Sequence, residues 1–248
     1  VEAVNLGIAK IILVGKVEKV KHQLAKYPCS YPDRIKIHDP IRSSLIKEFS
    51  KSYYELRKHK GITYEDAKKQ ATSNLVYAAL LVKNGHADGT LSGAVETTSN
   101  VVKTAIWVLG KATQVKTVSS CFLIFPKSHE PMIYADCGLV IEPNDEQLVD
   151  ITIAASQSCK SLLNTDPRIA LLSFSTKGSA KHRNTDKILL ALKKLKSLEP
   201  ELLVDGELQF DAAIDSAVGK IKAPESKVAG TANVMIFPNL DAGNIAYK

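Results

Sequence analysis

Two patterns of apolar residues alternate along this chain. Short unbroken apolar runs, which are typical of buried strands, predict strands at residues 10–14, 34–38, 89–92, 115–125, 132–141, 168–174, 202–204 and 233–237. Between them, apolar residues recur every three or four positions, which is typical of amphipathic helices. This second pattern predicts helices at residues 17–27, 43–59, 64–85, 98–110, 146–163 and 186–198.

The order of these elements predicts the fold class. Strands that lack polar alternation and are separated by helices indicate an α/β protein with mostly parallel sheets covered by helices on both faces. The predicted strands on either side of residues 126–130 follow one another without a helix. They predict a hairpin, and hence one antiparallel edge.

Charge divides the chain into two parts. Of the net charge of +7, residues 1–112 contribute 18 Lys and Arg against 10 Asp and Glu, whereas residues 113–248 contribute 15 against 16. The change coincides with a short segment, Gly110 to Thr113, that interrupts the apolar patterns. This segment is therefore the candidate boundary between two α/β parts, residues 1–112 and 113–248, in a chain long enough for one large domain or two small ones. The basic first part favours anionic ligands.

Several classes of protein are disfavoured by the sequence. No basic stripe interleaved with aromatic residues indicates nucleic-acid binding. No apolar run is long enough for a membrane span and no secretory leader is visible, so we expect a cytoplasmic protein without membrane contact. Cys29, Cys121, Cys137 and Cys159 show no Cys-x-x-Cys spacing. They predict buried free thiols and no metal site.

The segment from Asp88 to Asn100 is the strongest local signal of a binding site. A glycine turn at Gly93 leads into the hydroxyl residues Thr97 and Thr98, which precede the helix predicted at 98–110. Unpaired amides at a helix start can bind a phosphate. The alternative is an ordinary N-cap, and the local sequence by itself favours that alternative.

Five longer motifs occur in order along the chain. They are Tyr54-Glu-Leu-Arg-Lys-His-Lys-Gly61, Asp88-Gly-Thr-Leu-Ser-Gly-Ala94 with Thr97 and Thr98, Leu172-Ser-Phe-Ser-Thr-Lys-Gly-Ser-Ala180, Asp205-Gly-Glu-Leu-Gln-Phe-Asp-Ala-Ala213, and Ile236-Phe-Pro-Asn-Leu-Asp-Ala-Gly-Asn-Ile-Ala-Tyr-Lys248. Together they resemble the phosphate acetyl/butyryl transferase family, and its acetyl-transferring members in particular.

This resemblance implies an enzyme that transfers an acetyl group reversibly between acetyl phosphate and coenzyme A. Butyryl transfer is the alternative. The family implies two α/β/α domains of the isocitrate/isopropylmalate dehydrogenase-like type with a cleft between them, and a homodimer. It implies no metal and no cofactor, because coenzyme A serves as a substrate.

The resemblance also implies roles for individual residues. Those expected to bind substrate or phosphate are Arg57, Ser92, Thr97, Thr98 and Lys103. Lys103 stands where the family has an arginine, so orientation of the anion is expected to be weaker. Glu96 and Asn100 replace a His and an Asp of the family, and the Glu96 carboxylate would oppose an anion unless it is paired.

Further candidates follow two predicted strands in the second domain. The loop at 175–181 contains a glycine and could cradle an anion, while the Asn residues after the last strand have an alternative explanation as turn residues. The residues expected to line the cleft are Ser175, Thr176, Lys177, Ser179, Asn239 and Asn244.

The chain departs from the family at both ends. It begins at Val1, inside a segment that family members reach after an earlier strand and helix, so we expect an incomplete first domain. The family's Ser-Arg-Gly motif and its Asp base fall beyond the position of Lys248, and no catalytic residue is assigned. The alternative interpretation is therefore a truncated, non-catalytic remnant that keeps only anion or coenzyme A binding.

Overall fold

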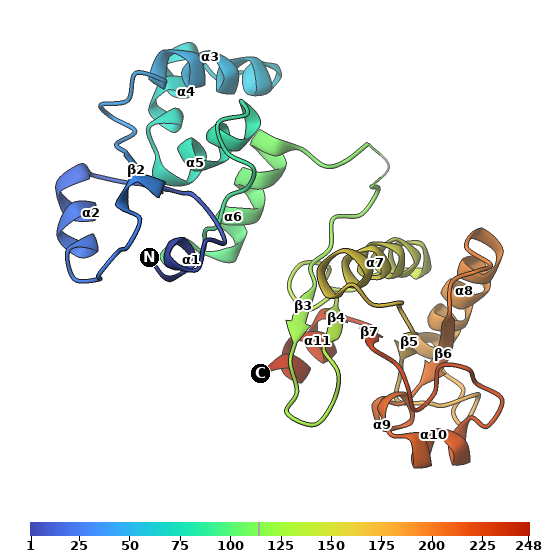
Figure 1. Cartoon of the computed structure of the whole chain (residues 1–248). Coiled ribbons are helices and arrows are strands. Elements are labelled where there is room, and N and C mark those ends of the chain that lie inside the picture. The colour runs from blue at the N-terminus through green and yellow to red at the C-terminus, as the bar shows by residue number, and fades with distance from the viewer. Residues whose placement is uncertain (114) are drawn as a thin grey trace. The chain divides into compact units, whose positions relative to one another are not determined.

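The computed structural model describes residues 1–113 and 115–248. The chain forms two compact units, Val1–Ala112 (unit 1) and Thr113–Lys248 (unit 2), each described by itself below. In Figure 1 they run from blue to green and from green to red.

Unit 1 combines a small sheet with a group of helices. Strands β1 (Ile11–Val14) and β2 (Ile35–His38) are parallel, with Ile11 opposite Ile35. The helices are α1 (Glu2–Asn5), α2 (Val17–Leu24), α3 (Ile46–Arg57), α4 (Tyr64–Ala71), α5 (Asn74–Lys83) and α6 (Thr98–Thr104), with 3₁₀ turns at Pro32–Arg34 and Lys58–Lys60. A π-helical segment, η3 (Ala105–Leu109), continues α6.

The core of unit 1 lies between α3, α4 and α5. Phe49 and Tyr77 are fully buried and their rings pack at 5.0 Å. Helix α5 is apolar on nearly every side, as expected for a helix enclosed by other elements. The Tyr77 hydroxyl lies 2.6 Å from Ser43 Oγ and 3.0 Å from His38 Nδ1. These bonds satisfy a polar group in the core and connect α5 to the end of β2.

Two predictions for unit 1 are wrong. The helix predicted at 64–85 is two helices, because the Ser73 hydroxyl accepts a hydrogen bond from Val76 N and starts α5 anew. The strand predicted at 89–92 is a loop with no strand partner among the described residues, and Leu91 in it is fully exposed. An isolated apolar run gains no stability as a strand unless a neighbour supplies its hydrogen bonds.

Unit 2 is built on a five-stranded sheet in the order β3-β4-β7-β5-β6. The strands are β3 (Phe122–Ile124), β4 (Met132–Ala135), β5 (Ile169–Leu172), β6 (Val204–Leu208) and β7 (Val234–Ile236). Among the strands that the structure describes in unit 2, only the β3–β4 pair is antiparallel, which confirms the predicted hairpin, whereas the other pairs are parallel.

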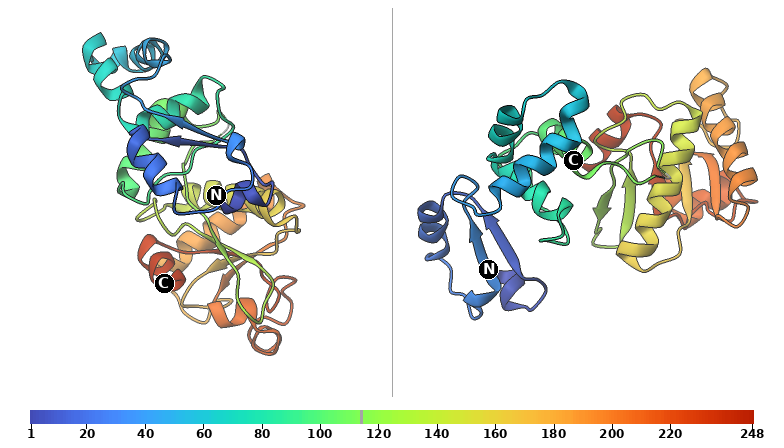
Figure 2. Two further views of the ribbon diagram at one scale, coloured as in Figure 1. Left: turned by 60° about the vertical axis from the view of Figure 1, so that its left-hand side comes forward. Right: turned by 90° about the horizontal axis from the view of Figure 1, so that it is seen from above.

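Helices cover both faces of this sheet, as predicted (Figure 2). Along β5, Ile169 and Leu171 point to one core and Ala170 and Leu172 to the other. The first core contains α7 (Asp145–Ser158), its π-helical continuation η4 (Cys159–Leu163) and α8 (Arg183–Leu198). The second contains α9 (Phe210–Ile214) and α11 (Leu240–Tyr247), with α10 (Ser216–Lys222) packed on α9.

The strand predicted at 132–141 ends early, at Ala135, because the next residue turns the chain. Asp136 is 2% exposed, and its carboxylate accepts hydrogen bonds from Ser120 and from the backbone amides of residues 138, 139 and 140. These amides therefore bond to a side chain and not to a neighbouring strand. Likewise, the strand predicted at 115–125 is reduced to β3.

Helix α11 packs closely on this turn. A Cβ atom at Gly243 would lie 2.4 Å from the Asp136 carbonyl oxygen and 3.1 Å from Cys137 Sγ. The Asn244 side chain donates to the Cys137 carbonyl at 3.1 Å. The position of α11 thus depends on the absence of a side chain at residue 243 and on the hydrogen bond donated by the Asn244 side chain.

Candidate functional site

In unit 1, one expected phosphate ligand stacks on an aromatic ring, and a second lines the same pocket as that ring. Arg57 ends α3, and its guanidinium lies over the Trp107 ring at 4.4 Å from the centroid. Trp107 belongs to η3, one turn beyond Lys103 of α6. Neither cation forms an ion pair with any residue that the structure describes. Both charges are therefore available to an anionic ligand.

A polar pocket of about 330 Å³ adjoins this ring. Its walls come from α3, α4, α5 and the α6–η3 segment, and Lys103, Trp107, Glu96 and Asn100 lie on its α6 side. Glu96 Oε2 accepts a hydrogen bond from Asn100 Nδ2 at 3.1 Å. The carboxylate is thus hydrogen-bonded but keeps its charge, and it lies in the same pocket as the Lys103 ammonium.

The Thr97 hydroxyl already accepts a hydrogen bond within the protein. Thr97 is the N-cap of α6, and its Oγ1 accepts from Asn100 N at 3.2 Å. The amides of Thr98 and Ser99 have no hydrogen-bond partner among residues 1–113 and 115–248. Thr98 and Ser92 are exposed. The strand predicted at 89–92 would place this loop directly after a strand end. Residues 89–92 form no strand, so that placement is wrong.

In unit 2, the loop that follows β5 is bonded to the segment that ends β6. Glu207 is 1% exposed, and its Oε1 accepts from Ser175 Oγ at 2.9 Å and from Gly178 N at 2.7 Å. Its backbone carbonyl accepts from Lys177 N at 3.1 Å. Thr176 Oγ1 accepts from Gln209 N at 2.9 Å. Two motifs whose bonded residues Ser175 and Glu207 lie 32 positions apart in the sequence thus form one structure.

These hydrogen bonds leave the loop few backbone amides that could bind an anion. The amides of residues 176 to 180 each donate to an acceptor in unit 2: Ser179 Oγ, the Glu207 carbonyl, Glu207 Oε1, the Thr176 carbonyl and Ser175 Oγ. Ser175 and Thr176 are themselves buried, whereas Lys177 and Ser179 are exposed. As the loop stands, its amides do not form the anion cradle suggested by the sequence.

Lys177 is held by an acidic partner. Its ammonium forms an ion pair with Asp205 and donates to the Gly206 carbonyl at 3.2 Å. Burial by itself would raise the pKa of Asp205, but hydrogen bonds from Lys177, Ser226 and the Gly206 amide lower this pKa below its ordinary value. The charge of Lys177 is therefore largely balanced inside unit 2.

The depressed pKa of Asp205 predicts acid sensitivity. A carboxylate with a lowered folded-state pKa stabilises the protein above its unfolded-state pKa, and this contribution is lost as the pH falls through the folded-state value. Asp205→Asn is therefore expected to lower the free energy of unfolding at pH 7 by about 1 kcal/mol and much less at pH 3. Urea unfolding at both pH values measures this, and an equal loss at both would contradict it.

The two expected asparagines have structural partners. Asn239 is the N-cap of α11 and accepts from Ala242 N at 2.9 Å. Asn244 donates to Cys137 O and accepts from Lys248 Nζ. Asn239 also lines a cavity of about 370 Å³ at the carboxyl ends of β5 and β7, whose aromatic walls the sequence analysis did not single out. Its walls are mainly apolar, with Phe174, Phe210 and Phe237 among them.

The buried thiols do not provide a nucleophile at neutral pH. Burial raises the pKa of Cys137 to about 12, and it raises the pKa of Cys159 as well. All four cysteines are free, as predicted, although Cys29 and Cys121 are only half-buried. Within residues 1–113 and 115–248, no helix combines the length and apolar character needed to cross a membrane.

Comparison with known proteins gives the family. The family model described as phosphate acetyl/butaryl transferase matches residues 1–248. The chain belongs to the phosphate acetyl/butaryl transferase family. It is therefore an acyltransferase by family, as the motifs indicated.

Individual members of this family are similar over nearly the whole chain. The phosphate acetyltransferase of Acetivibrio thermocellus is 42% identical over 247 residues, which cover 98% of this chain and 74% of that protein. The one of Thermoanaerobacterium thermosaccharolyticum is 40% identical over the same shares. A phosphotransacetylase structure from Streptococcus pyogenes has a TM-score of 0.89 at 36% identity and covers 99% of this chain and 74% of that one. These similarities confirm the predicted α/β fold class.

Proposed function

We propose that this chain transfers an acetyl group reversibly between acetyl phosphate and coenzyme A. The observation that carries the proposal is the match to phosphate acetyltransferases at about 40% identity over 98% of the chain. Acetyl transfer is preferred over butyryl transfer because these relatives are named for acetyl transfer. Coenzyme A and phosphate follow as substrates of the family reaction.

The reaction needs few groups. The coenzyme A thiol loses a proton and its sulfur attacks the acetyl carbonyl carbon, a C–S bond forms, and the bond from carbon to the phosphate oxygen breaks. Inorganic phosphate leaves with the electron pair. The protein must accept the thiol proton, stabilise the oxyanion and hold the phosphate. The residues described here offer groups for the third need, and coenzyme A is a substrate, so no cofactor is invoked.

We assign the phosphate to the pocket of unit 1. Arg57 and Lys103 supply unpaired positive charge, and the free amides of Thr98 and Ser99 lie at the start of α6. Charge-assisted hydrogen bonds of this kind contribute about 1.5–3 kcal/mol each. Ser92 and the hydroxyl of Thr98 are exposed near this helix start and remain expected ligands.

Arg57→Ala is expected to weaken phosphate binding by at least about tenfold, because one charge-assisted bond is lost. Lys103→Ala is expected to act in the same direction. Isothermal titration calorimetry with inorganic phosphate measures both. The matched control is Arg34→Ala, since Arg34 also lies over an aromatic ring, Tyr31 at 4.9 Å, but belongs to neither the pocket nor α3. Equal binding by all four proteins would overturn the assignment.

Glu96→Gln is expected to strengthen phosphate binding about threefold at low salt. The carboxylate lies in the pocket with Lys103 and repels an anion, while a glutamine oxygen can still accept the bond from Asn100. The gain should shrink at 0.5 M salt, because screening weakens repulsion between partly exposed charges. Calorimetry at two salt concentrations checks this, and a loss of affinity would show that Glu96 supports the site.

The reaction itself is tested by following thioester formation from acetyl phosphate and coenzyme A, with butyryl phosphate in parallel. Faster turnover of acetyl phosphate supports the proposal, and faster turnover of butyryl phosphate supports the butyryl alternative. Phosphate binding without turnover of either supports the non-catalytic alternative. A homodimer is proposed on the family resemblance, and sedimentation analysis tests it. The cytoplasmic location stays a prediction from the sequence.

A further inference from the structure

Lys103 brings a primary amine into the unit 1 pocket, at a position where the family has a guanidinium. It lines the pocket, is exposed, and forms no ion pair with any residue that the structure describes. A guanidinium stays protonated in proteins and is not a nucleophile, whereas a lysine amine that has lost its proton attacks carbonyl carbons. Lysine at this position therefore gives the pocket a reactivity that arginine would lack.

The positive charge of Arg57 lies at the wall of the same pocket. Its guanidinium stacks on Trp107 at 4.4 Å from the ring centroid, and Trp107 lines the pocket together with Lys103. Tyr53 is a second lining residue that responds to this charge. Burial raises the pKa of its hydroxyl, and the positive charge of Arg57 opposes that rise. An anion held by Arg57 would therefore share the pocket with the Lys103 amine.

The size and charge of the pocket fit a small acyl phosphate. Its volume of about 330 Å³ is at the lower end of the range for small-molecule sites. Glu96 also lines it, and the Glu96 carboxylate repels a phosphate group, whereas Arg57 and Lys103 attract it. The phosphate of such a ligand is thus directed to the two cations. Its acyl group then lies beside a cation that is also an amine.

We propose that Lys103 is a self-acetylation site, modified by acetyl phosphate bound in the unit 1 pocket. The identity of the acyl donor rests on the proposed function. The lysine first loses its proton to solvent. Its nitrogen then attacks the acetyl carbonyl carbon, a C–N bond forms, and the bond from carbon to the phosphate oxygen breaks. The phosphate leaves with the electron pair and takes up the proton that the nitrogen releases. The products are acetylated Lys103 and inorganic phosphate.

Acetylation lowers the affinity of the pocket for phosphate. It removes the charge of Lys103, which is one of the two cations assigned to the anion, while the opposing charge of Glu96 stays in place. With one charge-assisted bond lost, binding of inorganic phosphate should weaken about tenfold. An abundant acyl phosphate would thus limit occupancy of the site that binds it.

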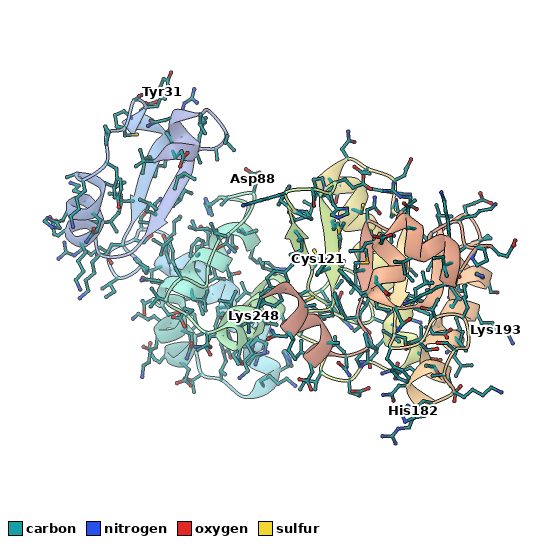
Figure 3. All side chains as sticks on the ribbon, turned by 90° about the horizontal axis from the view of Figure 1, so that it is seen from below. Tyr31, Asp88, Cys121, His182, Lys193 and Lys248 are labelled. Carbon is teal, nitrogen blue, oxygen red and sulfur yellow. The ribbon has the colours of Figure 1, made fainter. Side chains whose placement is uncertain are left out.

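The test is incubation of the whole chain with acetyl phosphate, without coenzyme A, followed by mass spectrometry of its peptides. Acetylation is expected to be at least about tenfold faster at Lys103 than at Lys193, because binding places the acyl group beside the amine. Lys193 is the internal control for reaction in solution. It is exposed on α8, makes no ion pair with any described residue, and lies at the periphery of unit 2 (Figure 3). Inorganic phosphate should slow the reaction at Lys103 only.

Two variants separate binding from reactivity. Arg57→Ala is expected to slow acetylation of Lys103 about tenfold and to leave Lys193 unchanged, whereas the control Arg34→Ala should change neither. Lys103→Arg keeps the positive charge but has no amine to acetylate. After treatment with acetyl phosphate, calorimetry should show about tenfold weaker phosphate binding by the unaltered protein and no change for Lys103→Arg.

Equal rates of acetylation at Lys103 and Lys193 overturn the proposal. So does a faster reaction at Lys103 that neither inorganic phosphate nor Arg57→Ala slows. Failure of the proposed function gives a different result, because the modification needs no coenzyme A. If Lys103 is acetylated in a phosphate-sensitive way but no thioester forms with coenzyme A, the modification site stands and the transferase activity does not. If the thioester forms and Lys103 reacts no faster than Lys193, the activity stands and the modification site does not.

Discussion

Asp136→Ala is expected to lower the free energy of unfolding of unit 2 by at least about 3 kcal/mol. The carboxylate is buried and accepts the hydroxyl and amide of Ser120 together with three backbone amides that follow it. Alanine would leave these donors buried without an acceptor, and each such donor costs about 1–3 kcal/mol. Urea unfolding followed by circular dichroism measures the effect.

A matched control separates the loss of these bonds from the loss of a negative charge. Asp166 is exposed and its side chain makes no hydrogen bond within the described residues, so Asp166→Ala should change the free energy of unfolding by less than about 0.5 kcal/mol. If the two alanine variants are equally stable, the turn after β4 does not depend on the Asp136 carboxylate.

Gly243→Ala is expected to destabilise unit 2 by at least about 2 kcal/mol, although alanine favours helices over glycine by about 1 kcal/mol. The added methyl would lie 2.4 Å from the Asp136 carbonyl oxygen, and this backbone atom cannot move away as a flexible side chain could. Helix α11 must then shift, and its bond from Asn244 to Cys137 is stretched or broken.

The displacement should also be visible in α11 itself. Amide hydrogen exchange in residues 240–247 is expected to accelerate in the variant, because local opening becomes less costly. Gly89→Ala is the control, since nothing lies within 4 Å of a Cβ at that position. Unchanged exchange in α11 together with an unchanged melting temperature would show that the helix tolerates the methyl group.

Much of the fold could be predicted because the spacing of apolar residues along the sequence shows which side chains are buried. The apolar runs at β1, β2, β5 and β7 and the hairpin of β3 and β4 were predicted in their places. The helix predicted at 64–85 was wrong because both halves are apolar at helical spacing, and the only sign of the break is a single capping serine, Ser73. The strand predicted at 89–92 is a loop, because the pattern of apolar residues does not show whether a neighbouring strand exists to pair with it.

The candidate sites depend on contacts between distant residues, which the sequence alone does not predict. The motifs and their family resemblance singled out Arg57 and Lys103, but no spacing rule shows that Arg57 stacks on Trp107 or that Lys103 shares a pocket with that ring. The glycine loop at 175–180 looks like an anion cradle until Glu207, about 30 residues away, occupies its amides. The aromatic cavity is formed by residues from four separate segments, so no local pattern could predict it.

The stacking of Arg57 on Trp107 provides an optical readout, because Trp107 is the only tryptophan in the chain. Indole emission depends on the charge and water next to the ring, and here the guanidinium expected to hold the anion lies 4.4 Å from the ring centroid. An anion that draws Arg57 away from the ring, or neutralises it there, should change both the intensity and the wavelength of the emission. The unlabelled protein can therefore report occupancy of its own unit 1 pocket, and a titration followed by fluorescence needs no engineered probe.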